Sequence, residues 1–367
     1  ATVTSLTFGG TGGTTTSTGN VATGGGILTL GGNVTYTNTG NPLGSTLSGN
    51  LALGAASRIF TINDSASTAA ELIVSAAIAG GAGVAVTKAG AGRLILSGAN
   101  TYAGATTVSA GVLRAASDTA LGSTAAGGSV ASGAALELIG GITIGAESFT
   151  LAGTGVGGTG ALLNVGGNNT FGGALTLSAA TTIGSAAGTL TLNGPGLNTG
   201  GNALTFAGAG DISLMIALGG TAGFTKTGAG ALSLDTVFNT TGTVVLAGGT
   251  LRLGGLGQTI GTLQVTGDSI LDFAGASTLN LTNLSVSAGV VLTIANWVDT
   301  VDFFRAFNNP GAPTLARVDF TAPYVPADTK WQPYDNQITP VPEPSTYGAL
   351  LLAAAAALVY FRRRKSK

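Results

Sequence analysis

Cysteine and histidine are both absent from this chain of 367 residues. Without cysteine there are no disulfides, so a folded domain must be stabilised by apolar burial and backbone hydrogen bonds alone. Without histidine, the commonest general base and the commonest metal ligand are missing together. We therefore expect no cofactor, no metal site and no catalytic residue, and we expect that the protein is not an enzyme.

Charged residues are also scarce. Asp, Glu, Lys and Arg make up 8% of the chain, and the formal net charge is −1. Five of the 14 basic residues lie in the last six positions, so residues 1–361 carry 9 basic and 15 acidic residues, a balance of −6. This distribution leaves no basic patch of the kind that binds nucleic acid, and we expect no nucleic-acid partner.

Glycine is abundant instead, with 63 residues, and 44% of the chain is hydrophobic. Glycine without a strict period of three excludes collagen, and the regular recurrence of Leu, Val and Ile argues against disorder. Triplets of the form apolar–any–apolar recur, for example at residues 28–30, 94–96, 136–138, 190–192 and 279–281. A period of two is that of a strand with one buried face, so we expect an all-β fold.

The chain also contains an internal repeat. Residues 87–114 align without a gap on residues 225–252 and are identical at eleven positions. In each copy two strands of the form Leu-x-Leu or Leu-Arg begin 18 or 19 residues apart. That interval suits one turn of a parallel β-solenoid, in which successive turns stack at about 4.8 Å.

The unit resembles the passenger-associated, autotransporter-type β-strand repeat, whose pattern includes Thr-Lys-x-Gly-x-Gly-x-Leu-x-Leu. The resemblance implies a right-handed parallel β-helix, which we place at residues 1–295 with about 15 turns. Unlike an autotransporter, this chain has only about 70 residues after the repeats, so we expect that another pathway exports it. The chain begins at Ala1 without Met, and we expect that a signal peptide has been removed.

The composition changes near Ala295. Both tryptophans, Trp297 and Trp331, and eight of the ten prolines lie beyond it. We interpret residues 296–340 as a short cap over the last turn followed by a spacer that contains proline.

Residues 341–367 combine three features. A Pro-Glu-Pro element on an extended backbone comprises Val341, Pro342, Glu343, Pro344, Ser345 and Thr346. An apolar run with helical propensity follows, in which we single out Tyr347, Leu350, Leu351, Leu352, Leu358, Val359, Tyr360 and Phe361. The run ends at a basic cluster that would stay in the cytoplasm, made of Arg362, Arg363, Arg364, Lys365 and Lys367.

This tail resembles a PEP-CTERM sorting signal, which is found on exported proteins of many Gram-negative bacteria. The resemblance implies processing by an exosortase, at least transient anchoring in the inner membrane, and delivery to the cell surface or extracellular matrix. The apolar run would extend roughly 22 Å as a helix, less than a bilayer core of about 30 Å. The alternative is an apolar helix buried in an assembly.

Several charged residues could carry chemistry. Lys88 and Lys226, with Arg114 and Arg252, occupy the same places in the two repeats. They could form a charged ladder for acidic polysaccharide, or they could face solvent and discourage edge pairing.

The acidic pairs Asp268/Asp272 and Asp299/Asp302 could belong to a polysaccharide-active site or to solvated turns. Residues 153–158 match a short phosphate-binding pattern that chance explains in a chain with 63 glycines. Residues 208–214 weakly resemble one calcium-binding nonapeptide, but one copy does not make a site, and Asp211 is then a turn residue.

From these features we expect an exported structural protein of the cell surface or extracellular matrix that associates with copies of itself into filaments or a layer. The alternatives are a monomeric carbohydrate-binding or adhesive surface protein and, less favoured, a polysaccharide-active β-helix enzyme. The expected partners are an exosortase, further copies of the chain, the membrane and extracellular polysaccharide.

Overall fold

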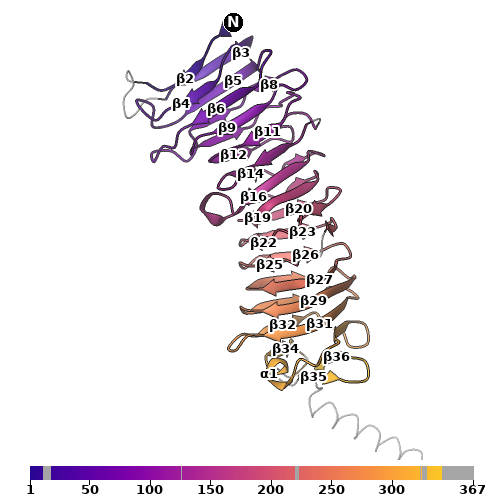
Figure 1. The fold of residues 1–367 in the computed structure, drawn as a ribbon. Coiled ribbons are helices and arrows are strands. Elements are labelled where there is room, and N and C mark those ends of the chain that lie inside the picture. The colour runs from indigo at the N-terminus through magenta and orange to yellow at the C-terminus, as the bar shows by residue number, and fades with distance from the viewer. Residues whose placement is uncertain (11–17, 125, 220–222, 323, 325–328, 341–367) are drawn as a thin grey trace, which may run out of the picture.

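The computed structural model describes every residue except 11–17, 125, 220–222, 323, 325–328 and 341–367. The chain coils into a rod of about 13 turns, with the N-terminus at one end and the short helix α1 (Ala312–Leu315) near the other (Figure 1). Neighbouring turns are joined by parallel strand pairing along the rod. The predicted all-β parallel solenoid is therefore confirmed.

Each turn contributes up to three short strands, which stack into three faces. Face 1 has two runs. The first run contains β2 (Leu6–Phe8), β4 (Val34–Tyr36), β6 (Arg58–Ile62), β9 (Val86–Ala89), β11 (Thr106–Val108), β13 (Gly128–Val130), β16 (Phe149–Gly153), the start of β19 (Leu175–Ser185), β21 (Leu197–Asn198) and β24 (Leu218–Gly219). The second run contains the starts of β27 (Asn239–Leu246), β29 (Gly257–Val265) and β31 (Thr278–Val286), and then β33 (Phe303–Ala306).

Face 2 contains the starts of β3 (Val21–Leu30) and β5 (Ser45–Ala52), then β7 (Leu72–Val74), β10 (Arg93–Leu96), β12 (Val112–Ala115), β14 (Ala135–Ile139), β17 (Leu162–Gly166), the end of β19, β22 (Leu204–Ala207), β25 (Thr225–Lys226) and the ends of β27, β29 and β31. The long strands therefore run round a corner from face 1 to face 2, or from face 2 to face 3.

Face 3 begins with β1 (Thr2–Val3), the ends of β3 and β5, and β8 (Ala77–Ala79). It continues with the nine strands β15 (Thr143–Ile144), β18 (Asn169–Phe171), β20 (Thr189–Leu192), β23 (Asp211–Leu214), β26 (Ala231–Leu234), β28 (Gly249–Arg252), β30 (Ser269–Asp272), β32 (Leu292–Ala295) and β34 (Val318–Phe320). Between β8 and β15 single backbone bonds, such as Ser123 N–H to the Tyr102 carbonyl, connect the turns.

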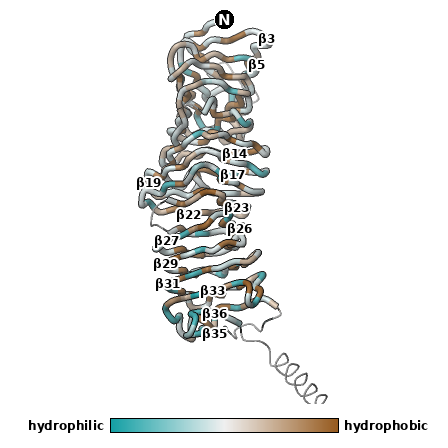
Figure 2. The backbone as a smooth tube through the Cα atoms, turned by 90° about the vertical axis from the view of Figure 1, so that its right-hand side faces the viewer, coloured by the Kyte–Doolittle hydropathy of each residue, from teal (hydrophilic) through white to brown (hydrophobic). Residues whose placement is uncertain are grey.

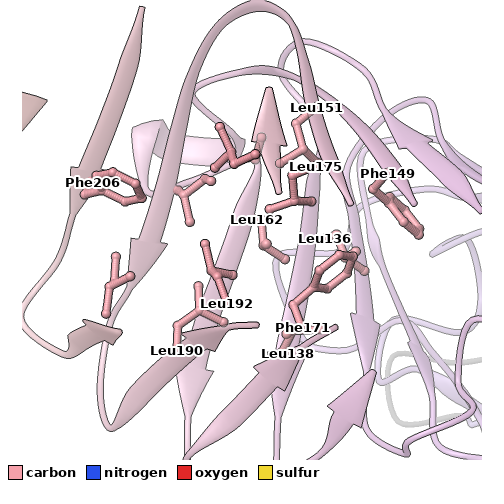
Figure 3. Packing of buried hydrophobic residues seen from close by; sticks show 14 of the residues in the cluster. Leu136, Leu138, Phe149, Leu151, Leu162, Phe171, Leu175, Leu190, Leu192 and Phe206 are labelled. Carbon is pink, nitrogen blue, oxygen red and sulfur yellow. The ribbon is translucent and has the colours of Figure 1, made fainter. Parts of the chain in front are cut away.

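The apolar positions of the strands form columns inside the rod. On face 2 one column pairs residues in register from turn to turn: Leu72, Leu94, Leu113, Leu136, Leu162, Ile183 and Phe206. All seven are fully buried, and side chains from the three faces meet in the interior (Figure 3). Each such side chain contributes roughly 1.5–3 kcal/mol by leaving water, so these columns are the main stabilising element of the rod.

Turn length varies, and this explains why there are fewer turns than expected. One turn takes 19 residues from Arg93 to Val112, but 28 residues from Leu6 to Val34. The estimate of about 15 turns assumed the shorter value throughout. Hydrophobic and neutral segments alternate along the tube, and strongly hydrophilic ones are few, as the low charge content predicts (Figure 2).

Parallel pairing continues beyond Ala295, where the sequence suggested that the solenoid ends. β33 pairs with β31, and β34 pairs with β32. Trp297 is buried between Phe273 and Phe320, at ring-centroid distances of 5.1 and 5.3 Å, so it lies inside the last turns. The first part of residues 296–340, which the sequence predicts to cover the last turn, thus belongs to the stack itself.

An antiparallel hairpin closes the C-terminal end instead. β35 (Thr329–Gln332) and β36 (Gln337–Pro340) pair with each other, and β36 pairs with β33 at Gln337 and Arg305. The indole N–H of Trp331 donates to the Ala306 carbonyl at 2.9 Å. The hairpin comes from residues that we had interpreted as a spacer.

The described residues contain almost no helix: only α1 and the single-turn 3₁₀ segment η1 (Val156–Gly158) occur. In this part of the chain no helix is long and apolar enough to span a membrane. The expected helix at residues 347–361, the Pro-Glu-Pro element and the basic cluster all lie outside the described residues.

Candidate functional site

The two repeat lysines do not face solvent. Lys88 has 0% and Lys226 has 2% of its surface exposed. Lys88 lies in an inward column between Phe60 and Val108, and Lys226 takes the corresponding place between Phe206 and Leu246. For the lysines, both interpretations from the sequence, a charged ladder and solvent-facing residues, are therefore wrong.

The ammonium groups bind the backbone at a corner of the rod. Lys88 Nζ donates to the carbonyls of Ala89 at 3.0 Å, Gly90 at 2.7 Å and Ala110 at 3.0 Å. Gly90 has a φ of +77°, a left-handed conformation that glycine adopts without strain. Because Ala110 belongs to the next turn, the lysine joins two turns at the corner.

The second repeat has the two contacts at the corner itself. Lys226 Nζ donates to the carbonyls of Thr227 at 2.8 Å and Gly228 at 2.9 Å, and Gly228 has a φ of +75°. The shared Thr-Lys-x-Gly sequence is thus a structural device. The lysine supplies hydrogen-bond donors to backbone carbonyls at the tight corner.

Burial changes the acidity of both groups. Loss of solvation lowers the pKa of the Lys88 ammonium to about 8, and the charge of Glu71 acts in the opposite direction. Loss of solvation also lowers the pKa of Lys226 to about 8, and here Asp211 opposes the shift. Hydrogen bonding to carbonyl dipoles is consistent with charged lysines at neutral pH.

The two repeats also lie on different faces. Lys88 is on β9 of face 1, whereas Lys226 is on β25 of face 2. Arg114 is on β12 of face 2, whereas Arg252 is on β28 of face 3. The sequence offset of the repeats is therefore not a whole number of turns, and equivalent residues cannot form one ladder along the rod.

Each repeat arginine is paired within the chain. Arg114 Nη2 lies 2.7 Å from Glu137 Oε2, and Arg252 Nε lies 2.9 Å from Asp272 Oδ2. In both cases the acid is directly beside the arginine on the next turn. Arg93 also approaches Glu137, with Nε 3.3 Å from Oε2. In each pair the carboxylate neutralises the guanidinium that was expected to bind an acidic polysaccharide. The charged-ladder interpretation is therefore also wrong for the arginines.

The remaining acidic candidates make local hydrogen bonds. Asp302 is buried and accepts from the backbone N–H groups of Ser277 at 2.8 Å and Val298 at 2.7 Å. Asp268 accepts from Val291 N at 2.9 Å, and Asp299 accepts from Thr300 N at 3.0 Å. Among the residues described, no three acidic side chains gather as metal ligands would.

Glu147 is a buried group that the sequence did not reveal. It lies between β15 and β16 with 1% of its surface exposed, and Oε2 has no hydrogen-bond partner among the described residues. Loss of solvation raises the pKa of its carboxyl to about 7. Burial also raises the pKa of Tyr102, and the charge of Glu147 adds to that shift. Only the turn geometry places Glu147 inside, so no local pattern could have found it.

The corner lysine leads to a first prediction. Lys88→Met keeps the long side chain but removes the donor for three carbonyls, so we expect the free energy of unfolding to fall by about 2–4 kcal/mol. Urea unfolding followed by circular dichroism measures the change. The control is Lys330→Met at an exposed position, which should change stability by less than about 0.5 kcal/mol. A Lys88→Met protein as stable as the wild type would contradict the assignment.

Glu147 leads to a second prediction. Since its folded-state pKa is raised above the ordinary 4.5, its contribution to stability is fully present below that value and is lost as the pH rises through about 7. Glu147→Gln should therefore raise the melting temperature at pH 8 and reduce the difference between pH 5 and pH 8. Asp64→Asn, at an exposed carboxylate, should leave the wild-type difference unchanged. The same pH difference in Glu147→Gln as in the wild type would count against this role.

Two family models match the chain. The passenger-associated-transport-repeat model matches residues 86–115 and 224–253, which include both corner lysines. The PEP-CTERM protein-sorting motif model matches residues 340–365. No curated protein and no solved structure matches. The chain thus contains a match to the PEP-CTERM protein-sorting motif, and its parallel β-solenoid contains two matches to the passenger-associated-transport repeat.

Proposed function

We propose that the protein is a structural component of the bacterial cell surface or extracellular matrix and that it associates with copies of itself. The sorting motif supports export to the cell surface and processing by an exosortase. The repeats match a model named for transported passenger segments, which fits an exported protein, although the route differs from that of an autotransporter. In this proposal the protein is not an enzyme, and the tail anchors it in the inner membrane at least until processing.

The observation that best supports the structural role is an uncharged column of hydroxyl groups on face 1. Its members pair in register from turn to turn, and we name them the hydroxyl ladder: Thr87, Thr107, Ser129, Thr150, Thr176 and, at its end, the amide of Asn198. Their side chains are half-buried or exposed. Neighbouring members lie about 4.8 Å apart, so the ladder offers regularly spaced donors and acceptors.

Such a surface suits contact with a second copy. Two identical ladders can face each other across a two-fold axis, so that each hydroxyl meets a hydroxyl. The low charge content, 8% of residues, keeps electrostatic repulsion between copies small. The closing hairpin pairs with β33 at the C-terminal end, which favours contact through the sides of the rod over contact through that end.

A second candidate is a monomeric protein that binds extracellular polysaccharide. The hydroxyl ladder also supports this function, because sugar hydroxyls can exchange hydrogen bonds with a row of Thr and Ser side chains. The two candidates differ in whether the purified protein assembles by itself.

The sorting role can be tested in cells that contain an exosortase. We expect Glu343→Ala to leave the protein unprocessed and in the membrane fraction, because it removes the only charged group of the Pro-Glu-Pro element. Asp335→Ala, an acidic substitution of the same kind a few residues earlier, should be processed as the wild type. Cell fractionation and the mass of the released protein measure both results. Normal release of the Glu343→Ala protein would refute a sorting role for this element.

Self-association can be tested with the purified full-length chain by sedimentation and negative-stain microscopy. Thr150→Lys combined with Thr176→Lys places like charges on adjacent exposed rungs of the ladder, and we expect this protein to remain monomeric where the wild type forms filaments or a layer. Thr143→Lys with Thr170→Lys makes the matched change on face 3 and should not affect assembly. A monomeric wild type that is retained by insoluble polysaccharide would favour the second candidate.

A further inference from the structure

A pocket of about 480 Å³ opens where the closing hairpin meets the last turns of the rod. Its lining comes from the loop before β33, the start of β33, the segment after β34 and both strands of the hairpin. The lining includes Asp299, Phe303, Tyr324, Gln332, Tyr334 and Gln337. The volume falls within the range of about 300–1,000 Å³ that is usual for small-molecule sites.

Aromatic rings form one part of the lining, and two of them are held in place. Tyr324 packs edge-on against Phe320 at a centroid distance of 6.1 Å, and Phe320 is itself fixed against Trp297. The guanidinium of Arg305 lies 4.5 Å from the centre of the Phe303 ring. Tyr334, in contrast, is 83% exposed at the tip of the hairpin, which is unusual for so large a ring.

The rest of the lining is polar but carries no positive charge. Asp299, Gln332, Gln337 and Thr339 supply carboxylate, amide and hydroxyl groups, and no lysine or arginine is among the lining residues described. Gln332 Nε2 donates to Thr339 Oγ1 at 3.4 Å, a long bond that a ligand hydroxyl could replace. Arg305 lies against the Phe303 ring but is not among the lining residues, so the only charge that the described lining presents to a ligand is the carboxylate of Asp299.

The backbone beside this pocket is strained at Thr300. Among the residues described, the only non-glycine residues with positive φ are Asn296, Thr300 and Asn336, at +55°, +68° and +59°. All three lie near the C-terminal end, and Thr300 lines the pocket. Left-handed backbone is costly for a β-branched residue, and such strain is concentrated at ligand-binding sites in proteins.

We propose that this pocket binds a neutral sugar ring of a polysaccharide. The apolar face of a pyranose would stack on Tyr334 and Tyr324, and its hydroxyls would bond to Asp299 and to the glutamine amides. The lack of positive charge selects against uronic acids. The pocket gives the rod a discrete binding point at one end, which is separate from the hydroxyl ladder and does not depend on self-association.

The test uses the full-length chain in a detergent without a sugar headgroup, so that the detergent cannot compete. Isothermal titration with short neutral oligosaccharides of glucose, mannose and galactose should show binding of at least one of them, and an oligosaccharide of uronic acid should bind more weakly. Tyr334→Ala should weaken the binding about tenfold, whereas Tyr334→Phe keeps the ring and should retain it. Phe307→Ala, at a ring that is 58% exposed but outside the pocket, is the control and should not change binding.

The proposal is overturned if none of the neutral oligosaccharides binds, if Tyr334→Ala binds as tightly as the wild type, or if the uronic-acid oligosaccharide binds best. Tyr334 is almost entirely exposed, so its substitution should not prevent folding. Fractionation and sedimentation are read independently of sugar binding. If no sugar binds, the proposed sorting and self-association are unaffected. If processing or self-association is not observed, the proposal that the pocket binds sugar is unaffected.

Discussion

Everything in this structure depends on keeping inward side chains in register from one turn to the next. Side chains alternate between inside and outside, so a shift of one residue would turn a whole strand inside out. The column from Leu72 to Phe206 shows that register is kept although turn length varies. The turns differ in length at their corners, where the chain often needs glycine. At Gly111, for example, a Cβ atom would lie 2.4 Å from the Gly90 carbonyl oxygen, so no larger residue fits without a shift. In a chain without disulfides, this stacking and its backbone bonds must provide the stability.

The corner lysines are the informative exception to an apolar interior. Each interrupts a column of hydrophobic residues, and the alternation itself already indicated this, because Val86 and Lys88 are two positions apart and share the inward side of β9. An isolated buried ammonium would be costly, and the corner carbonyls offset that cost. What the two repeats share is thus chemistry that fixes a corner of the fold. The surfaces available for contact with other molecules are therefore the hydroxyl ladder and the pocket at the closing hairpin.

Local patterns predicted the strands, the parallel stacking and the 19-residue spacing between paired strands such as those that contain Leu94 and Leu113. They could not predict contacts that depend on register over longer distances. Glu137 meets Arg114, and Asp272 meets Arg252, only because the turns between them have particular lengths. The closing hairpin reaches back to Arg305 from a segment rich in proline, and its pocket combines residues from four separate segments. The sorting element, in contrast, was readable from sequence because its order and spacing are themselves the signal.

The most direct test of the stacked rod is a set of distances along one face. Cysteines can be introduced without background, because the chain has none. Spin labels at Thr87 and Thr150 lie three turns apart on the hydroxyl ladder, and labels at Thr87 and Asn198 lie five turns apart. With a rise of about 4.8 Å per turn, pulsed electron resonance should give narrow distributions near roughly 14 Å and roughly 24 Å. Broad distributions, or a distance from Thr87 to Asn198 no longer than that from Thr87 to Thr150, would contradict in-register stacking of the turns.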